Sequence, residues 1–137
     1  MARRARGELL ATIPLFAKLN AKQLAAVDGL ATAIDVAQGR ELIREGQPGR
    51  EFFIVVDGTV EVRRNGRKLT VLGPGSFVGE VALLSQIPRT ATVTATSAVD
   101  LLVISDQAFT ALLEKQPAIA VKVARTLAER VGETLAP

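Results

Sequence analysis

Turn signals recur about every ten residues through the middle of the chain and divide it into short runs of strand-forming residues. The clearest is Asn65-Gly66, which lies between two such runs. This dipeptide is typical of a type I′ hairpin, because both central residues of that turn need positive φ. Asp57-Gly58 and Gly73-Pro74-Gly75 mark further turns. The rhythm favours an antiparallel sandwich or barrel over a parallel α/β sheet.

Helical periodicity flanks this β-rich region on both sides. Residues 7–34 are predicted to be helical, with Asn20 as N-cap and Gln23 three residues later, the arrangement of a capping box. Residues 105–137 are predicted to form two helices, the first capped by Ser105 and the second beginning at Pro117. For the second helix we expect an apolar stripe, formed by Ala120, Val123, Ala124, Leu127 and Val131.

Together these patterns predict a single domain that spans residues 1–137. Its fold class is mainly β with flanking helices: a small antiparallel β-roll or jelly-roll barrel over residues 35–104, a helical N-terminal lead-in and two C-terminal helices. The hydrophobic fraction of 48% is enough for a core, and that core is predicted to be aliphatic because the chain has five Phe, no Trp and no Tyr.

The chain contains neither cysteine nor histidine. Zinc, haem and non-haem iron therefore lack their usual ligands, and cysteine nucleophiles and serine-histidine triads are excluded. We expect no enzyme activity, no metal and no cofactor. A metal-dependent barrel enzyme, which many short strands could also suggest, ranks far below a binding protein for the same reason.

Net charge is +3, and part of it lies in the opening "MARRARGELL". Three arginines there could contact nucleic acid or an acidic lipid surface, but a solvated N-terminus is the favoured interpretation. Without aromatic residues for stacking beside them, we expect no nucleic-acid partner. No apolar run reaches the roughly 18 residues of a membrane span, and the start lacks a secretory apolar core. These features predict a cytoplasmic protein.

The stretch "GEVALLSQIPRTATV" has an unusual combination of residues. Gly79 permits a tight turn, and the apolar residues after it begin a short helix whose amides attract an anion. Arg89 offers a planar, permanently charged fork that suits phosphate oxygens. Glu80 can accept a hydrogen bond from a sugar hydroxyl. Singly, Arg89 is typical of a surface loop and Glu80 of a first helical turn, but together they indicate a site for a small nucleotide anion.

The same stretch, "PGSFVGEVALLSQIPRTATVTA", resembles the phosphate-binding cassette of cyclic nucleotide-binding domains, here residues 79–92. "GREFFIVVDGTVEV" is similar to the strands before that cassette, and "FTALLEKQPAIAVKVARTLAER" to the family's hinge and lid helices. The resemblance covers nearly the whole chain, and it departs at Val78, where the family usually has an aromatic residue. Relatives include cyclic-nucleotide-gated channels, kinase regulatory subunits and catabolite-type activators.

The resemblance implies a role for each matching position. Gly79 and the amides of Val81 and Ala82 would contact the cyclic phosphate, and Arg89 its exocyclic oxygens. Glu80 would bind the ribose 2′-hydroxyl. Thr90 would add a hydroxyl that also reaches a guanine amino group, so we expect cAMP as the ligand with cGMP tolerated.

The resemblance also implies a lid and apolar walls for the base. Arg130, on the last helix, is predicted to cover the base, with a solvated helix charge as the alternative. Val62 and Val71 are candidate walls, although core packing explains either valine as well.

The predicted function is a sensor whose last helix closes over the base of a bound cyclic nucleotide. The alternative is the ligand-binding part of a catabolite-type regulator, although its helix-turn-helix would have to follow Pro137, where this sequence stops. The sequence does not identify the partner that receives the signal. It also leaves open whether the domain is free-standing or excised from a larger protein, and whether it forms a homodimer through the last helix.

Overall fold

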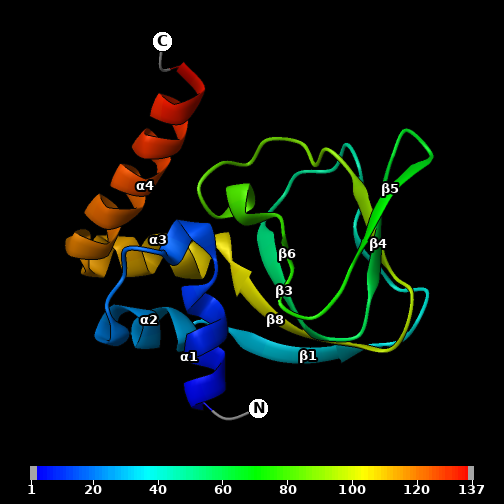
Figure 1. Ribbon diagram of the computed structural model, residues 1–137, viewed down its shortest axis with the longest axis horizontal. Helices are drawn as coiled ribbons and strands as arrows, with labels where there is room; N and C mark the ends of the chain where they lie inside the picture. The colour runs from blue at the N-terminus through cyan, green and yellow to red at the C-terminus, as the bar shows by residue number, and fades with distance from the viewer. Residues whose placement is uncertain (1–2, 136–137) are drawn as a thin grey trace. The chain divides into compact units, whose positions relative to one another are not determined.

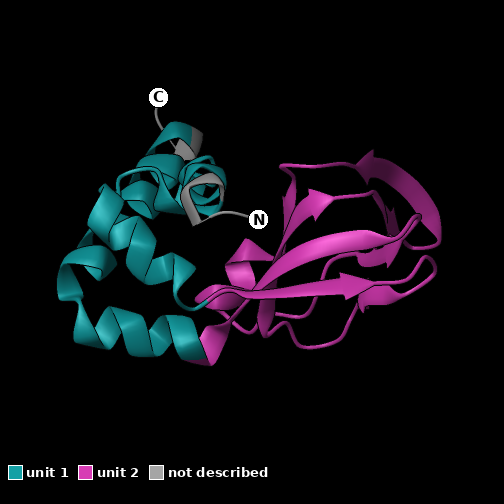
Figure 2. Cartoon of the chain, turned by 90° about the horizontal axis from the view of Figure 1, so that it is seen from below, with its two compact units in different colours: residues 1–30, 108–137 teal, residues 31–107 magenta. Residues whose placement is uncertain are grey.

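The structure is a computed structural model that describes residues 3–135. The chain divides into two compact units, coloured separately in Figure 2. Unit 1 holds the described residues up to Leu30 and from Ala108 onward, and unit 2 holds Ala31–Gln107. The predicted domain limits at Met1 and Pro137 lie outside the described residues, and the extent of a single domain stays a prediction.

Unit 2 is built from two antiparallel four-stranded sheets, with strand orders β1-β8-β3-β6 and β2-β7-β4-β5 (Figure 1). This confirms the prediction of a mainly β protein with flanking helices. The strands are β1 (Thr32–Val36), β2 (Glu41–Ile43), β3 (Glu51–Asp57), β4 (Val60–Arg64), β5 (Arg67–Leu72), β6 (Phe77–Val78), β7 (Thr92–Ala95) and β8 (Val99–Ser105).

The predicted hairpin joins β4 to β5. Asn65 and Gly66 have φ values of 53° and 75°, as a type I′ turn requires. The core of unit 2 is aliphatic apart from phenylalanine, and both sheets contribute to it. Phe53 and Val55 of β3 pack in one buried cluster with Val60 of β4 and Val93 of β7. This core fixes the β4–β7 face on which the candidate site lies.

Unit 1 contains helices from both ends of the chain: α1 (Arg3–Ala11), η1 (Pro14–Phe16), α2 (Ala21–Asp28), α3 (Asp106–Lys115), which begins in unit 2, and α4 (Pro117–Leu135). The capping box of α2 is present, since Gln23 N donates to Asn20 Oδ1 at 2.9 Å and Asn20 N donates to Gln23 Oε1 at 3.0 Å. Phe16 and Phe109 are fully buried, with ring centroids 5.8 Å apart.

Two predicted boundaries shift by a few residues. The region expected to be helical up to residue 34 already becomes β1 at Thr32, because the chain turns after α2 ends at Asp28. Ser105 closes β8, and α3 begins at Asp106, whose Oδ1 accepts from the Gln107 amide at 2.8 Å.

The expected apolar stripe of α4 was partly wrong. Val123 is buried as predicted, but its buried neighbours are Ile119 and Thr126, and Val131 is 55% exposed. Small and apolar residues occupy most of the helix circumference, so periodicity alone did not identify the buried side. Arg130 comes four residues after Thr126 and is therefore on the same side of α4 as the buried positions, although Arg130 itself is exposed.

Among the arginines of the opening segment, Arg6 is the one whose side chain the structure describes. Arg6 forms an ion pair with Asp28, with Nε 2.7 Å from Oδ1, and the side chains of both residues are largely buried. Arg6 therefore ties α1 to α2 instead of presenting a solvated charge. The side chains of Arg3 and Arg4 lie outside the described residues.

Candidate functional site

The cassette begins where β6 leads into η2 (Glu80–Leu83), next to β3. Gly79 lies between them with φ 82° and ψ 22°, a left-handed conformation that favours glycine. Ala82 and Leu83 are buried and anchor the short helix, whereas Val81 is 54% exposed. The Ala82 amide donates to the Gly79 carbonyl at 3.0 Å and closes the first turn.

Arg89 is held in place by its side chain and by its backbone. Its Nη2 donates to the carbonyl oxygen of Glu51 at 2.6 Å. Its amide donates to Gln47 O, and its own carbonyl accepts from Gly46 N, each at 2.8 Å. The guanidinium position is thus determined by contacts with the segment that enters β3, which lies far away in sequence.

Two glycines make room for the guanidinium of Arg89. A Cβ at Gly49 would lie 2.8 Å from Nε, and a Cβ at Gly79 would collide with Nη1. Any other residue type at either position would therefore displace the guanidinium. The absence of side chains at positions 49 and 79 is a requirement of this arginine conformation.

Burial lowers the pKa of Arg89, and the nearby Glu51 carboxylate partly offsets that effect. An arginine stays protonated at neutral pH even so. The side chain is therefore a permanent cation that has lost part of its hydration. Such a cation binds an anion more strongly than a fully solvated one does, because less water has to be removed.

Two neighbouring cavities border Arg89, and they share Gly79, Arg89 and Thr90. The first has a volume of about 200 Å³, and its apolar walls are Ile43, Val62, Val78, Ala91 and Val93. The second has a volume of about 220 Å³ and extends along η2, with walls that include Glu80, Val81, Ala82, Ile87 and Pro88. The Arg89 side chain thus borders both the cavity with apolar walls and the cavity at the start of η2.

The structure brings most of the predicted site residues together around these cavities: Gly79, Glu80, Val81, Ala82, Arg89, Thr90 and Val62. Glu80 is half-buried, and its Oε2 is shielded from solvent. Arg130 belongs to α4 of unit 1, and its role stays a prediction.

Val62 and Val71 lie on opposite faces of their sheet. In the β4–β5 pairing, Val62 is opposite Thr70 and Glu61 is opposite Val71. Because successive residues of a strand alternate between faces, Val71 faces away from the cavity that Val62 borders. Val71 is also 45% exposed. This register does not support Val71 as a wall of the site.

Sequence reasoning missed several residues that border or shape the site. Ile43 of β2, Val93 of β7 and Arg64 of β4 line the first cavity, and Gly49 makes room for Arg89. None of these residues belongs to a contiguous motif, so they reach the cassette only through strand pairing and, for Gly49, through the isolated bridge between Pro48 and Pro88. The one available signal was the Gly-rich "GQPGR" before β3, whose glycines have no evident role in a strand.

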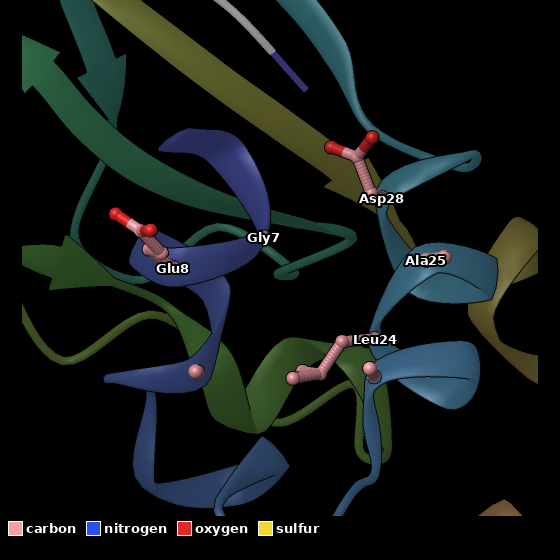
Figure 3. A pocket seen from close by; sticks show the side chains of 7 residues that line it. Gly7, Glu8, Leu24, Ala25 and Asp28 are labelled. Atoms are coloured by element: carbon pink, nitrogen blue, oxygen red, sulfur yellow. The ribbon is translucent and has the colours of Figure 1, made fainter. Parts of the chain in front are cut away.

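A larger cavity, of about 500 Å³, lies within unit 1 between α1 and α2. Leu24 points from α2 into this space (Figure 3). The ionisable residues of its lining are Glu8 and Asp28, both acidic. No basic side chain is among the described residues that line this cavity, so size alone does not make it the candidate site for a phosphate anion.

Neither a metal site nor a membrane-spanning helix is found in the described part of the chain. Residues 3–135 contain no cluster of three or more acidic side chains that could hold a metal ion. Within the same residues, no helix combines the length and the apolar character needed to cross a bilayer.

Comparison with known proteins agrees with this geometry. Residues 33–116 match the family model described as "Cyclic nucleotide-binding domain". A cyclic nucleotide-gated potassium channel of Mesorhizobium japonicum is 39% identical over 125 residues, which cover 91% of this chain and 35% of the channel. This chain thus spans about a third of that relative.

Solved structures show the same similarity in three dimensions. The N-terminal domain of a transcriptional regulator from Streptomyces coelicolor A3(2) superposes with a TM-score of 0.85 at 34% identity, covering 93% of this chain and 94% of that one. The regulatory domain of Toxoplasma gondii PKA, in complex with cAMP, gives a TM-score of 0.73 at 34% identity, covering 80% and 43%. The chain therefore belongs to the cyclic nucleotide-binding domain family, as a regulatory domain and not a catalytic one.

Proposed function

We propose that this chain is a sensor that binds cAMP and also accepts cGMP at the cavities around Arg89. The observation that supports this most is the bracing of Arg89, whose partly dehydrated guanidinium is held beside the start of η2. A cyclic phosphate carries one negative charge and two exocyclic oxygens. That group matches one planar fork and a helix start.

The remaining cassette residues would each contact a different part of the ligand. The exposed start of η2 would present the Val81 amide to the phosphate. The Ala82 amide already donates to Gly79 O, so its phosphate contact would be shared with that bond. Glu80 would accept from the ribose 2′-hydroxyl, and the apolar wall that includes Val62 would contact the base.

We further propose that α4 acts as a lid over the base. The buried side of α4 is defined by Ile119, Val123 and Thr126, and Arg130 continues that side toward the end of the helix. A ligand that contacts Arg130 only in the closed arrangement would shift the population toward closure. The signal is then the change in the position of α4.

Replacing Arg130 with alanine is expected to weaken binding about 2- to 5-fold, and by different factors for cAMP and cGMP. The reason is that an exposed guanidinium on an aromatic face contributes only about 0.5–1 kcal/mol. Calorimetric titration measures both affinities. Arg125→Ala, which removes an exposed charge from another side of the same helix, is the matched control and should bind like the unaltered chain. If Arg130→Ala binds both nucleotides with unaltered affinity, Arg130 has no place in the lid.

The proposed function is tested by titrating the chain with cAMP, cGMP and AMP. We expect both cyclic nucleotides to bind, and AMP to bind more weakly, because its phosphate carries nearly two negative charges and is not closed into a ring through the ribose 3′-oxygen. AMP binding as tight as that of cAMP would show that the ring is not recognised. No binding of either cyclic nucleotide would contradict the proposal.

A second candidate function is the ligand-binding part of a catabolite-type transcription regulator. It is favoured by one observation, the 94% coverage of the Streptomyces coelicolor domain. In that case residues 1–137 alone should bind DNA only weakly, with an affinity that falls as salt rises. Tight, sequence-specific binding of DNA by this chain in a gel-shift experiment would contradict its assignment as the ligand-binding part alone.

A further inference from the structure

Arg64 is a second arginine at the candidate site, and the proposed function gives it no role. It is the last residue of β4 and borders the 200 Å³ cavity together with Arg89 and Thr90. Its Nε donates to the Thr90 carbonyl oxygen at 2.9 Å. The bond spans 26 positions in sequence and holds the Arg64 side chain against the end of the cassette.

The charge of Arg64 is not matched by a carboxylate, unlike the charges of its neighbours. Arg63 pairs with Glu61 at 2.9 Å, and Arg44 pairs with Glu41 at 2.6 Å. Among the described residues, no acidic side chain lies within ion-pair distance of Arg64, and its recorded hydrogen bond is to a neutral carbonyl. Its two terminal amino groups therefore keep their donors for another acceptor.

We infer that Arg64 is a base-reading residue that raises the affinity of this site for guanine relative to adenine. The inference rests on the proposed function. Guanine presents two adjacent acceptors, O6 and N7, and an arginine fork matches this pair. Adenine presents N7 beside an amino group, so one donor of the fork meets another donor. The apolar walls formed by Val62, Val78 and Val93 provide the surface for the flat face of the base.

Thr90 and Arg64 would recognise different edges of guanine. A threonine hydroxyl at the cassette can accept from the 2-amino group, whereas Arg64 would donate to O6 and N7. Cyclic inosine monophosphate separates these contributions, because it keeps O6 and N7 and lacks the 2-amino group. If Arg64 reads the base, this nucleotide should respond to the loss of Arg64 as cGMP does.

The test is calorimetric titration of the unaltered chain, Arg64→Ala and Arg64→Lys with cGMP, cAMP and cyclic inosine monophosphate. In Arg64→Ala we expect the affinities for cGMP and the inosine nucleotide to fall about 10-fold, and that for cAMP to change by less than about 2-fold. Arg64→Lys keeps the charge but loses the planar fork, so its loss of affinity for these two nucleotides should be smaller than that of the alanine variant. Arg63→Ala, the matched control, removes the neighbouring charge and should leave the cGMP-to-cAMP ratio unaltered.

The ratio of affinities separates base reading from a structural role. If Arg64 only holds the Thr90 backbone, Arg64→Ala will weaken all three nucleotides by the same factor, and the inference is wrong. It is also wrong if the inosine nucleotide behaves like cAMP in this series, since the 2-amino group then carries the preference. In both cases the unaltered chain still binds cyclic nucleotides, so the proposed function survives. If the unaltered chain binds none of them, both fail.

Discussion

Replacing Arg89 with alanine is expected to weaken cAMP binding by at least about 10-fold. The variant removes the charged fork that the structure holds between Gly49 and Gly79. Hydrogen bonds to a charged group contribute about 1.5–3 kcal/mol each, and about 1.4 kcal/mol corresponds to a factor of ten. Burial partly dehydrates Arg89 in the folded chain, which also lowers its pKa, so this part of the dehydration is not a cost of binding. Calorimetric titration measures the loss.

Two companion variants make the Arg89 result interpretable. Arg89→Lys keeps the charge but cannot present two parallel donors, so it should also bind weakly. Arg44→Ala removes an exposed arginine that pairs with Glu41 on β2, and it should bind like the unaltered chain. Equal affinities in the unaltered chain, Arg89→Ala and Arg89→Lys would remove the basis for this site.

Replacing Gly79 with alanine is expected to reduce both stability and binding. Its φ of 82° is left-handed, which costs a residue with a Cβ about 1–2 kcal/mol. The added Cβ would also collide with Arg89 Nη1 and lie 3.1 Å from the carbonyl oxygen of Glu51. The guanidinium must then leave its position, so cAMP affinity should fall about as far as in Arg89→Ala, by about 10-fold or more.

Gly75→Ala is a matched control for the Gly79 variant. Gly75 has a similar φ, 89°, but a Cβ there would meet nothing within 4 Å. Thermal unfolding should therefore show a loss of stability in both variants, at least as large in Gly79→Ala, whereas titration should show a loss of cAMP affinity only in Gly79→Ala. If Gly79→Ala binds as tightly as Gly75→Ala, the close approach of Gly79 to Arg89 is not needed for binding.

The elements that depend on local residue chemistry could be predicted from the sequence. Asn65-Gly66 forms the β4–β5 hairpin, and Asn20 with Gln23 forms the capping box of α2. Each of these features depends on neighbours within a few residues. The cassette is also contiguous in sequence, which is why Arg89 and Glu80 could be assigned to one site before the structure was known.

Features that depend on contacts between distant segments could not be predicted. The Glu51 carbonyl that fixes Arg89 lies 38 positions away from it, and the Thr90 carbonyl lies 26 positions from Arg64. The Arg64 contact accompanies the pairing of β4 with β7, and the Arg89 contact lies beside an isolated bridge between Pro48 and Pro88. Neither pairing is visible in a single sequence. The same limitation explains Val71, which has the hydrophobic character of a cavity wall but lies on the other face of its sheet.

For unit 1, the sequence predicted the last helix but not which of its sides is buried. α4 has small or apolar residues over much of its surface, so the expected stripe included Ala124 and Val131, which are exposed. Packing against other parts of the chain selects Ile119, Val123 and Thr126 as the buried side. A hydrophobic period establishes that a helix exists more reliably than it establishes which side is covered.

A crystal structure of the chain grown with cAMP tests the central claim most directly. The account predicts density for the nucleotide at the cavities that share Gly79, Arg89 and Thr90, with its phosphate within hydrogen-bond distance of the Arg89 guanidinium. Nucleotide density between α1 and α2, elsewhere on the surface, or nowhere in crystals with an open site would contradict it.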